Sequence, residues 1–227
     1  MSISIFDVAG PVMVGPSSSH TAGAAKLARA AAALVGTDFD RVRFGLSGSF
    51  ARTGQGHGTD KALVAGVLGM PASDERLPHS FEIARERGLD FSFYNEDIQN
   101  AHENTVRISF SYHGQPERVV EGFSAGGGRI CITGFEKFDT VMYCDNPTAA
   151  IIHIDRPGVL SGITAAFAAC GMNIALLRCA RLKRGDISLC TVETDEPIPE
   201  HMVTWLRKVV GVVSVGVIDP EDWGAEI

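Results

Sequence analysis

The stretch AAIIHIDRPGVL, residues 149–160, decides how the C-terminal part of the chain folds. Its apolar run through Ile154 predicts a buried strand, and Asp155–Gly158 has the composition of a turn. From Val159 to Cys170 apolar residues recur at spacings of three and four, which predicts a helix. Gly171 is the glycine that commonly follows a helix C-terminus. A strand, a turn and a helix are therefore expected in that order.

The chain downstream of this unit completes a regular pattern. Residues 173–182 and 187–193 predict two strands joined by a hairpin at Lys183–Asp186. Pro199–Val209 predicts a helix, and Val212–Ile218 predicts a last strand. The order strand-helix-strand-strand-helix-strand is that of the ferredoxin-like βαββαβ arrangement.

The upstream part mixes strands and helices without repeating that pattern. A boundary is expected near Cys144–Pro147, which divides the chain into domains at residues 1–145 and 148–220. The predicted class is α+β, with an α/β domain first and the ferredoxin-like domain second. Upstream strands are expected at residues 2–6, 41–47, 90–94, 106–112 and 118–123, and helices from residue 22, over 61–68 and within 71–88.

Composition limits the classes of function. The chain has 227 residues, of which 45% are hydrophobic and 21% charged, as in soluble globular proteins. A net charge of −7 argues against nucleic acid or an anionic membrane as a partner. No apolar run approaches the ~20 residues of a membrane span, and the N-terminus lacks the pattern of a signal peptide. A cytoplasmic location is therefore expected.

The five cysteines give no metal-binding or disulfide pattern. No two of them form a C-x-x-C pair, and an odd number argues against a disulfide framework. They sit mostly in apolar runs, which favours buried thiols. We therefore see no obvious ligand set for zinc or an iron–sulfur cluster on this chain. The cysteines are Cys131, Cys144, Cys170, Cys179 and Cys190.

The glycine-rich stretch GSFARTGQGHGTDK, residues 48–61, lies between a predicted strand and a predicted helix. Such glycines let the backbone approach a ligand closely. Thr59 or Asp60 can cap the following helix, whose first N–H groups can bind an anion. His57 beside such a site can act as an acid or a base. The alternative is an ordinary turn with a surface histidine. A phosphate-binding P-loop is disfavoured, because G-x-x-x-x-G-K-[ST] is not matched.

A second loop, Gly15–Thr21, carries several hydroxyl side chains and His20 before a strongly helix-forming run. Thr21 or a preceding serine is a natural N-cap, and the helix N-terminus beyond it can hold a carboxylate or phosphate. Simple capping of the helix explains one or two of these hydroxyl residues but hardly all four, which are Ser17, Ser18, Ser19 and Thr21. A third loop, Gly126–Gly128, permits either close ligand approach or a flexible turn between two strands.

The remaining histidines fit surface positions better than catalytic ones. His79 lies in a polar linker, His113 in a predicted hairpin turn and His201 at a predicted helix start. His102 is intermediate, because it neighbours a possible motif.

The C-terminal pattern resembles an ACT domain. The resemblance is carried by His153–Leu160 and Gly171–Ile174. ACT domains generally bind small molecules after the first strand, usually across a dimer interface. In serine-sensing relatives such as phosphoglycerate dehydrogenase, the positions matching His153, Asp155 and Asn173 contact the effector. The resemblance therefore implies a dimer through this domain and an effector site. This chain has Asp155 where those relatives have Asn, and an acidic group there disfavours a carboxylate. The implied effector-binding residues are His153, Asp155, Gly158 and Asn173.

Three motifs upstream, GPSSSHTAG, TGQGHGTDKA and SAGGGRI, together resemble the β chain of the iron–sulfur-dependent L-serine dehydratases. The resemblance covers residues 1–220 and implies a first domain of the allosteric substrate-binding type, which also occurs in some phosphoglycerate dehydrogenases. One departure is visible. The family commonly shows His-Pro-Asn-Thr where this chain has His102-Glu103-Asn104-Thr105, and losing the proline changes loop stiffness and adds a charge.

The resemblance implies a two-chain enzyme that converts L-serine to pyruvate and ammonia. A separate α chain would carry a [4Fe–4S] cluster, and the β chain would bind none alone. The resemblance favours His57 as the base for the α-proton, with His20 orienting substrate or stabilising charge. A non-catalytic module that senses serine is the alternative. The implied substrate-binding residues are Ser17, Ser18, Ser19, Thr21, Gly58, Thr59, Asp60, Lys61, Asn104, Gly126, Gly127 and Gly128.

Overall fold

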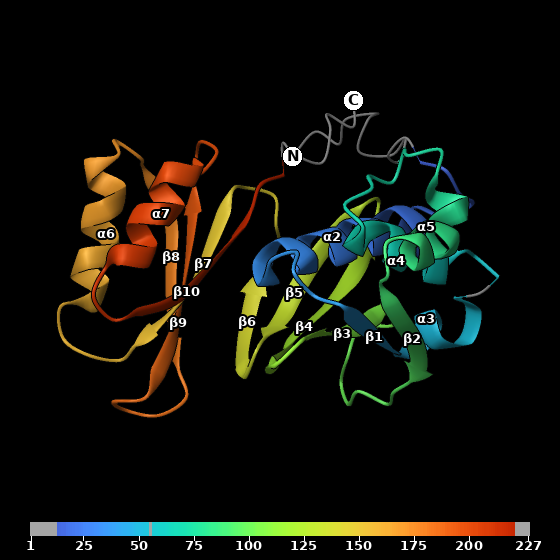
Figure 1. Cartoon of the computed structure of the whole chain (residues 1–227), viewed down its shortest axis with the longest axis horizontal. Coiled ribbons are helices and arrows are strands. Elements are labelled where there is room, and N and C mark those ends of the chain that lie inside the picture. The colour runs from blue at the N-terminus through green and yellow to red at the C-terminus, as the bar shows by residue number, and fades with distance from the viewer. Residues whose placement is uncertain (1–12, 55, 221–227) are drawn as a thin grey trace.

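The computed structural model describes residues 13–54 and 56–220. The expected strand at residues 2–6 and the acidic tail beyond residue 220 lie outside the described residues. Figure 1 shows two sheets side by side, each with its own helices. The α+β class is therefore confirmed.

The first sheet has six strands in the order β2-β1-β3-β4-β5-β6. β1 and β2 run parallel, and every other neighbouring pair is antiparallel. Alternation along β1 buries Val42 and Phe44 while Arg41 and Arg43 stay exposed, as expected when one face of a sheet is covered. The strands are β1 (Arg41–Leu46), β2 (Asp90–Asn95), β3 (Thr105–Tyr112), β4 (Gln115–Gly126), β5 (Arg129–Phe135) and β6 (Phe138–Met142).

Helices cover one face of this sheet (Figure 1). The alanine-rich helix α2 lies across the middle of the sheet, where small side chains let α4 pack closely against it. Leu27, Leu63 and Phe110 are fully buried between the layers. The helical segments are η1 (Ser18–Ala22), α2 (Gly23–Val35), α3 (Gly48–Thr53), α4 (Thr59–Val67), η2 (Leu77–His79) and α5 (Ser80–Glu86).

The second sheet has four antiparallel strands in the order β10-β7-β9-β8. With two helices on one face, this is the predicted ferredoxin-like arrangement. Gly171 follows α6 with φ +71°, as expected for a glycine after a helix C-terminus. The elements are β7 (Thr148–Ile154), α6 (Val159–Ala169), β8 (Ile174–Arg181), β9 (Ile187–Thr194), α7 (Glu200–Lys208) and β10 (Val212–Ile218).

Each face of the second sheet has its own core. Ile151 and Val192 pack beneath α6 and α7, whereas Ile152, Leu189 and Ile218 on the opposite face join the core of the first sheet. The ACT-like sheet is therefore buried on both faces, one against its own helices and one against the upstream part of the chain. None of the helices within residues 13–54 and 56–220 is long and apolar enough to cross a membrane.

Two elements differ from the sequence-based expectation. The glycine-rich stretch contains a short helix, α3, because its one dense glycine cluster begins only at Gly54. β6 was not expected, since the apolar residues Phe138 and Met142 are four apart and fit a helix as well as a strand.

Candidate active site

His20 lies in the widened turn that leads into α2. Ser18–Ala22 form a π-helix, in which the Gly23 N–H donates to the Ser18 carbonyl. Ser17 caps this turn, because its Oγ accepts from the His20 N–H at 3.2 Å. Of the hydroxyl residues expected as caps, Ser17 caps the π-turn, whereas α2 itself begins after Ala22 with no side-chain cap. Such π-turns are rare and are frequent at functional sites.

Both ring nitrogens of His20 have hydroxyl neighbours. Nε2 lies 3.1 Å from Ser49 Oγ and 3.2 Å from Thr53 Oγ1. Nδ1 lies 3.1 Å from Ser19 Oγ. Ser49 and Thr53 are four residues apart on α3 and so share one face of that helix. Because a hydroxyl can donate or accept, this arrangement holds the imidazole in either neutral tautomer.

The surroundings of His20 favour its neutral form. Burial lowers the pKa of His20 below its usual value, and the positive charge of a protonated His57 lowers that pKa further. The Phe50 ring packs edge-on against the imidazole, with 5.3 Å between the ring centroids. His20 is therefore neutral at neutral pH and can offer one hydrogen bond without carrying a charge.

His57 lies on the loop between α3 and α4 and is exposed. Its Nδ1 is 3.2 Å from the Thr53 carbonyl oxygen. A carbonyl can only accept, so Nδ1 carries the proton in this contact and the lone pair of the neutral ring sits on Nε2. An exposed imidazole with its lone pair on Nε2 has the form that a general base requires.

The two histidines face one another across the start of α2. Their ring centroids are 5.0 Å apart, with the planes tilted by 46°. Thr21 joins the two loops, since its buried Oγ1 donates to the His57 carbonyl at 3.2 Å. Beside His57 is a cavity of about 200 Å³, lined in part by Thr21, Gly58 and Lys61. The structure therefore brings together residues from the first two sequence motifs.

The segment His102–Thr105 contacts α3 through Glu103. The Ser49 N–H donates to the Glu103 carbonyl at 2.5 Å, and the Glu103 carboxylate pairs with Arg52. Gly48 makes this approach possible, because a Cβ there would lie 2.4 Å from the Glu103 oxygen and φ is +57°. Glu103, where the family commonly has proline, thus gains an ion-pair partner on α3.

Asn104 ties the same segment to the end of β4. Its Nδ2 donates to the Ser124 carbonyl at 3.2 Å, and the Ser124 N–H donates back to the Asn104 carbonyl at 3.1 Å. His102 stacks on Phe123 at 4.5 Å between centroids and lies outside the histidine pair. Asn104 therefore joins the segment that contacts α3 to the end of β4, and substrate contact by its side chain stays a prediction.

The start of α4 corrects the expected capping. Gly58, in the left-handed conformation at φ +70°, is the N-cap, and neither Thr59 nor Asp60 caps the helix with its side chain. Thr59 is fully buried, and its Oγ1 has no hydrogen-bond partner among the described residues. Asp60 Oδ1 accepts from the Lys61 N–H at 2.8 Å. Within the described residues the side chains of Asp60 and Lys61 form no ion pair with each other.

The triple-glycine loop stands apart from the histidine pair in its contacts. Gly126, Gly127 and Gly128 all have positive φ and turn the chain from β4 into β5. Space is open around Gly126 and Gly127, where an added Cβ would meet nothing within 4 Å. No hydrogen bond within the described part of the chain joins this loop to His20 or His57, so its substrate role stays a prediction.

The expected effector residues are engaged with their own domain. Asp155 Oδ2 accepts from the Gly185 N–H at 3.1 Å and from Arg181, which lowers the pKa of Asp155. Asn173 Nδ2 donates to Asp195 at 2.8 Å. His153 is buried, and its Nε2 has no partner among the described residues. Gly158 is the N-cap of α6. Whether these residues bind an effector stays a prediction.

The described residues do not fit an iron–sulfur cluster. Within residues 13–54 and 56–220 no group of three or more His, Cys, Asp or Glu side chains is placed to hold a metal ion. Cys131, Cys144 and Cys190 are buried, and burial raises the pKa of each thiol, which disfavours the thiolate that ligates iron.

Ser49 and Thr53 were missed by the sequence analysis, although both contact His20. The signal available was two hydroxyl residues at a spacing of four, which places them on one face if the segment is helical. The glycines of residues 48–61 favour a loop over a helix, so from the sequence alone this spacing does not predict a shared face.

Residues 148–218, called here the ACT half, have the strand and helix order of an ACT domain. Residues 13–142, the upstream half, present a pair of facing histidines on two loops. A family described as "AHAS small subunit-like ACT domain" matches residues 150–214. A family described as "Serine dehydratase beta chain" matches residues 4–77, which include both histidine loops. Together with relatives of 38% and 40% identity that span about nine-tenths of the chain, this match shows that the chain belongs to the serine dehydratase β-chain family.

Two similar proteins match nearly the whole length of this chain, and a third matches about half of it. The "probable L-serine dehydratase, beta chain" of Bacillus subtilis is 38% identical over 212 residues, which cover 93% of this chain and 96% of that protein. The "L-serine dehydratase, beta chain" of Peptoniphilus asaccharolyticus is 40% identical over 88% of this chain and 90% of that protein. The "L-serine dehydratase TdcG" of Escherichia coli is 30% identical over 56% of this chain but only 33% of that protein.

Proposed function

We propose that this chain is the β subunit of an iron–sulfur-dependent L-serine dehydratase, which deaminates L-serine to pyruvate and ammonia together with an α chain. The observation that carries the proposal is the facing pair of His20 and His57. The His20 imidazole is hydrogen-bonded at both ring nitrogens and neutral, and the His57 imidazole is exposed with its lone pair on Nε2. Relatives similar over about nine-tenths of the chain bear the β-chain name.

In this proposal His57 Nε2 takes the α-proton of serine, and the electron pair of that C–H bond forms the Cα–Cβ double bond as the β-hydroxyl group leaves. The proton arriving at Nε2 makes an imidazolium, whose Nδ1–H keeps its contact with the Thr53 carbonyl, and this contact stabilises the charge. The nearby charge disfavours protonation of His20, so the pair holds one positive charge and not two. His20 thereby stays a neutral hydrogen-bonding group during the transfer.

Substrate binding is assigned to the groups around this pair. Ser17 and Ser19 beside His20, with Ser18 and Thr21 in the same turn, supply hydroxyls near a helix N-terminus, a favourable place for a carboxylate. Lys61 and Gly58 line the cavity beside His57, and Thr59 and Asp60 lie between them at the start of α4. Asn104 and Gly126–Gly128 complete the proposed set.

An α chain is part of the proposal. The E. coli relative carries the name L-serine dehydratase with no chain designation, and the match spans only a third of it. Because the described residues of this chain hold no set of cluster ligands, the [4Fe–4S] cluster would be bound by the α chain.

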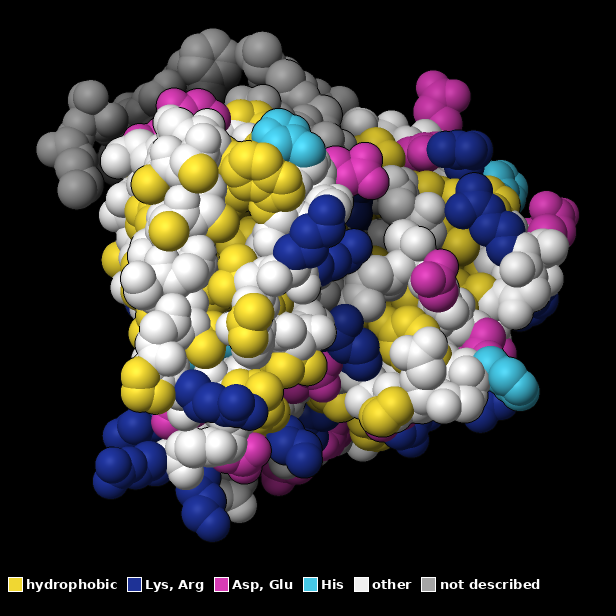
Figure 2. Space-filling view, turned by 60° about the vertical axis from the view of Figure 1, so that its left-hand side comes forward, with side chains coloured by type: hydrophobic (Ala, Val, Ile, Leu, Met, Phe, Trp, Pro, Cys, Tyr) yellow, Lys and Arg dark blue, Asp and Glu magenta, His cyan; other side chains and the backbone are white. Residues whose placement is uncertain are grey.

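We further propose the division into domains at 1–145 and 148–220 and a dimer through the ACT domain. Large apolar side chains on that domain are partly exposed, and Figure 2 shows apolar side chains spread over this face of the molecule. They include Leu160, Leu177, Leu182, Trp205, Val210 and Val213. We also propose an effector site in the same domain at His153, Asp155, Gly158 and Asn173.

The test is His57→Gln in the anaerobically prepared two-chain enzyme, with pyruvate formation as the readout. Loss of a general base costs about 10²–10⁴-fold in kcat. His113→Gln is the matched control, because His113 is exposed in the turn between β3 and β4. We expect the control to keep the parent activity.

Full turnover by His57→Gln would contradict the proposed base. If the isolated chain then also bound L-serine by calorimetry, the non-catalytic serine-sensing function would replace the catalytic one.

A further inference from the structure

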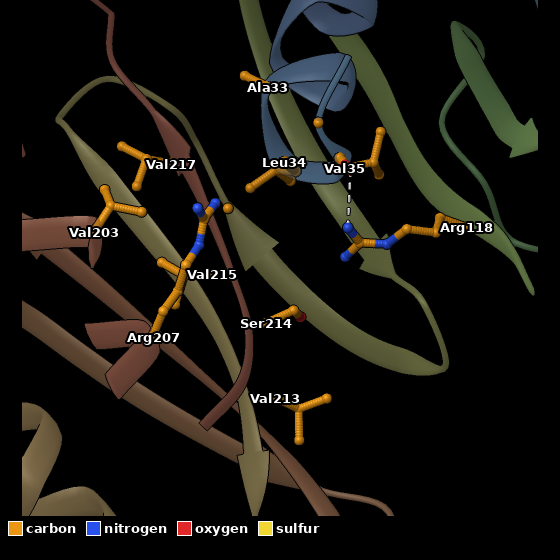
Figure 3. Close-up of a pocket in the computed structure, with 12 residues that line it drawn as sticks. Ala33, Leu34, Val35, Arg118, Val203, Arg207, Val213, Ser214, Val215 and Val217 are labelled. Atoms are coloured by element: carbon orange, nitrogen blue, oxygen red, sulfur yellow. Dashed lines mark hydrogen bonds between the residues drawn. The ribbon is translucent and has the colours of Figure 1, made fainter. Parts of the chain in front are cut away.

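A pocket of about 380 Å³ lies where the two halves of the chain meet. Figure 3 shows its two walls, with the C-terminal end of α2 and Arg118 on one side and residues of α7 and β10 on the other. Its volume is in the range of small-molecule sites, which is about 300–1,000 Å³. None of the residues proposed for serine binding lines it.

The two walls are held together by a close backbone contact. Gly216 on β10 passes so near α2 that a Cβ at this position would lie 2.2 Å from the Leu34 carbonyl oxygen. The walls of the pocket are therefore in contact beside it, and any ligand there touches both halves of the chain at once.

The charge of the lining is one-sided. Arg118 and Arg207 are the only charged residues among those that line the pocket within the described chain. Figure 3 shows both guanidinium groups directed into the space between α2 and β10, from opposite walls. Because Glu136 already pairs with Arg118, Arg207 carries the positive charge of the lining that an anion would neutralise.

The two arginines differ in what already holds them. Arg118 donates from Nε to Glu136 and from Nη1 to the Val35 carbonyl at 3.0 Å, and its guanidinium packs on the Phe135 ring. Arg118 is therefore fixed in place. Arg207, on α7, has no hydrogen bond or ion pair among residues 13–54 and 56–220. Its donors are available to a ligand.

The rest of the lining is aliphatic. Leu34, Val203 and Val215 stand around the space between the arginines (Figure 3). We infer that this interdomain pocket binds a small aliphatic carboxylate, with the carboxylate at Arg207 and Arg118 and the hydrocarbon chain against the valines. Guanidinium groups match carboxylates in geometry, and the aliphatic wall favours a short apolar chain over inorganic anions.

The test is calorimetry of isovalerate binding to the full chain, with neutral isovaleramide as the matched ligand and sulfate as an inorganic anion. We expect isovalerate to bind with a dissociation constant of about 1 mM or tighter, as befits a small ligand with one charged contact, and the other two at least tenfold more weakly. The assay needs neither the α chain nor turnover, so its result is independent of the proposed enzymatic function.

Variants locate the binding. Arg207→Gln should weaken isovalerate binding about tenfold, because it removes charge-assisted hydrogen bonds, and Arg207→Lys should fall between. Arg184→Gln, at an exposed arginine in the β8–β9 hairpin, makes the same change of charge away from the pocket and should bind as the parent does. Equal binding of isovaleramide, no binding of isovalerate, or equal affinities in Arg207→Gln and Arg184→Gln would each overturn the inference.

Discussion

His20 is held by more hydroxyl groups than one imidazole can use fully, and this redundancy has a measurable consequence. Ser49 and Thr53 both lie within hydrogen-bonding distance of Nε2, so removing one leaves the other in place. We expect Ser49→Ala and Thr53→Ala each to cost about 1 kcal/mol of stability or less. The double variant should cost more than the sum, because the Nε2 contact is then lost altogether.

Two readouts check this coupling. Urea unfolding of the four proteins in the double-mutant cycle measures the interaction free energy. Turnover of the two-chain enzyme should fall most in the double variant, because hydroxyl groups then hold His20 through Nδ1 and no longer through Nε2. Additive single effects would show that the two hydroxyls do not act on a shared atom.

The lowered pKa of His20 sets how stability depends on pH. In the unfolded chain the imidazole titrates near its ordinary value, about 6.5, and in the folded chain it titrates lower. The unfolded state therefore binds the proton first as pH falls. The stability that the neutral, partly buried ring contributes is full above about pH 6.5 and is lost as pH falls toward the folded pKa.

His20→Gln removes this titration and should flatten the dependence. We expect the parent to lose more stability than His20→Gln between about pH 7 and pH 5, the range just below the ordinary imidazole pKa. Chemical denaturation at several pH values measures the difference. Parallel curves for the two proteins would contradict the assigned direction of the shift.

At the scale of the element, Gly48 decides where α3 can lie. Its φ of +57° and the Glu103 oxygen 2.4 Å from any Cβ both oppose a side chain. Gly48→Ala should therefore cost about 3 kcal/mol or more, since strain and a backbone clash add. It should also lower turnover, because Ser49 and Thr53 move with α3.

Gly69→Ala separates these two causes. Gly69 has φ +83°, but an added Cβ there meets nothing within 4 Å, so only the backbone strain of about 1–2 kcal/mol remains. Thermal or urea unfolding of both variants gives the comparison. Similar losses in the two would mean that contact with Glu103 adds nothing to the placement of α3.

Elements with a clear apolar period were predictable, and those defined by their partners were not. The alternation in Arg41–Leu46 and the spacings of three and four after Val159 follow directly from which side chains must be buried. The helix α3 has weak helical propensity, with a glycine first, and is stabilised by Glu103, which accepts from the Ser49 N–H and pairs with Arg52. Tertiary contacts of this kind leave no local pattern.

The candidate site was predictable only as separate pieces. The sequences of the loop Gly15–Thr21 and of the glycine-rich stretch 48–61 each indicate a possible ligand site. Only the resemblance to the serine dehydratase β chain assigns both to one active site. That His20 meets His57 at 5.0 Å depends on the packing of α2 against α4, and on Thr21 reaching the His57 carbonyl. Contacts across more than thirty residues follow from the fold, which single-sequence patterns do not specify.

At the scale of the whole molecule, α2 connects the two sites described above. Its N-terminal end continues the turn that carries His20, and its C-terminal end lines the pocket with Arg118 and Arg207. A helix of this length is a rigid rod of about 20 Å. Contacts at the junction of the two halves therefore bear on the position of the histidine turn.

Gly216→Ala tests how far the two halves depend on each other. The added methyl would lie 2.2 Å from the Leu34 carbonyl, and a backbone oxygen at the end of a helix cannot move aside without shifting α2 or β10. We expect a cost of about 1–3 kcal/mol, as for overpacking, concentrated at the junction between the sheets. Because Ile152, Leu189 and Ile218 belong to the core of the first sheet, separating the halves exposes them to water. Calorimetry should then show a broadened or split transition in place of one cooperative transition.

Gly185→Ala, at φ +79° in the β8–β9 hairpin with open space around it, should destabilise the ACT half by local strain and keep a single transition. A single sharp transition in Gly216→Ala, lowered no more than in Gly185→Ala, would mean that the halves fold without relying on this contact.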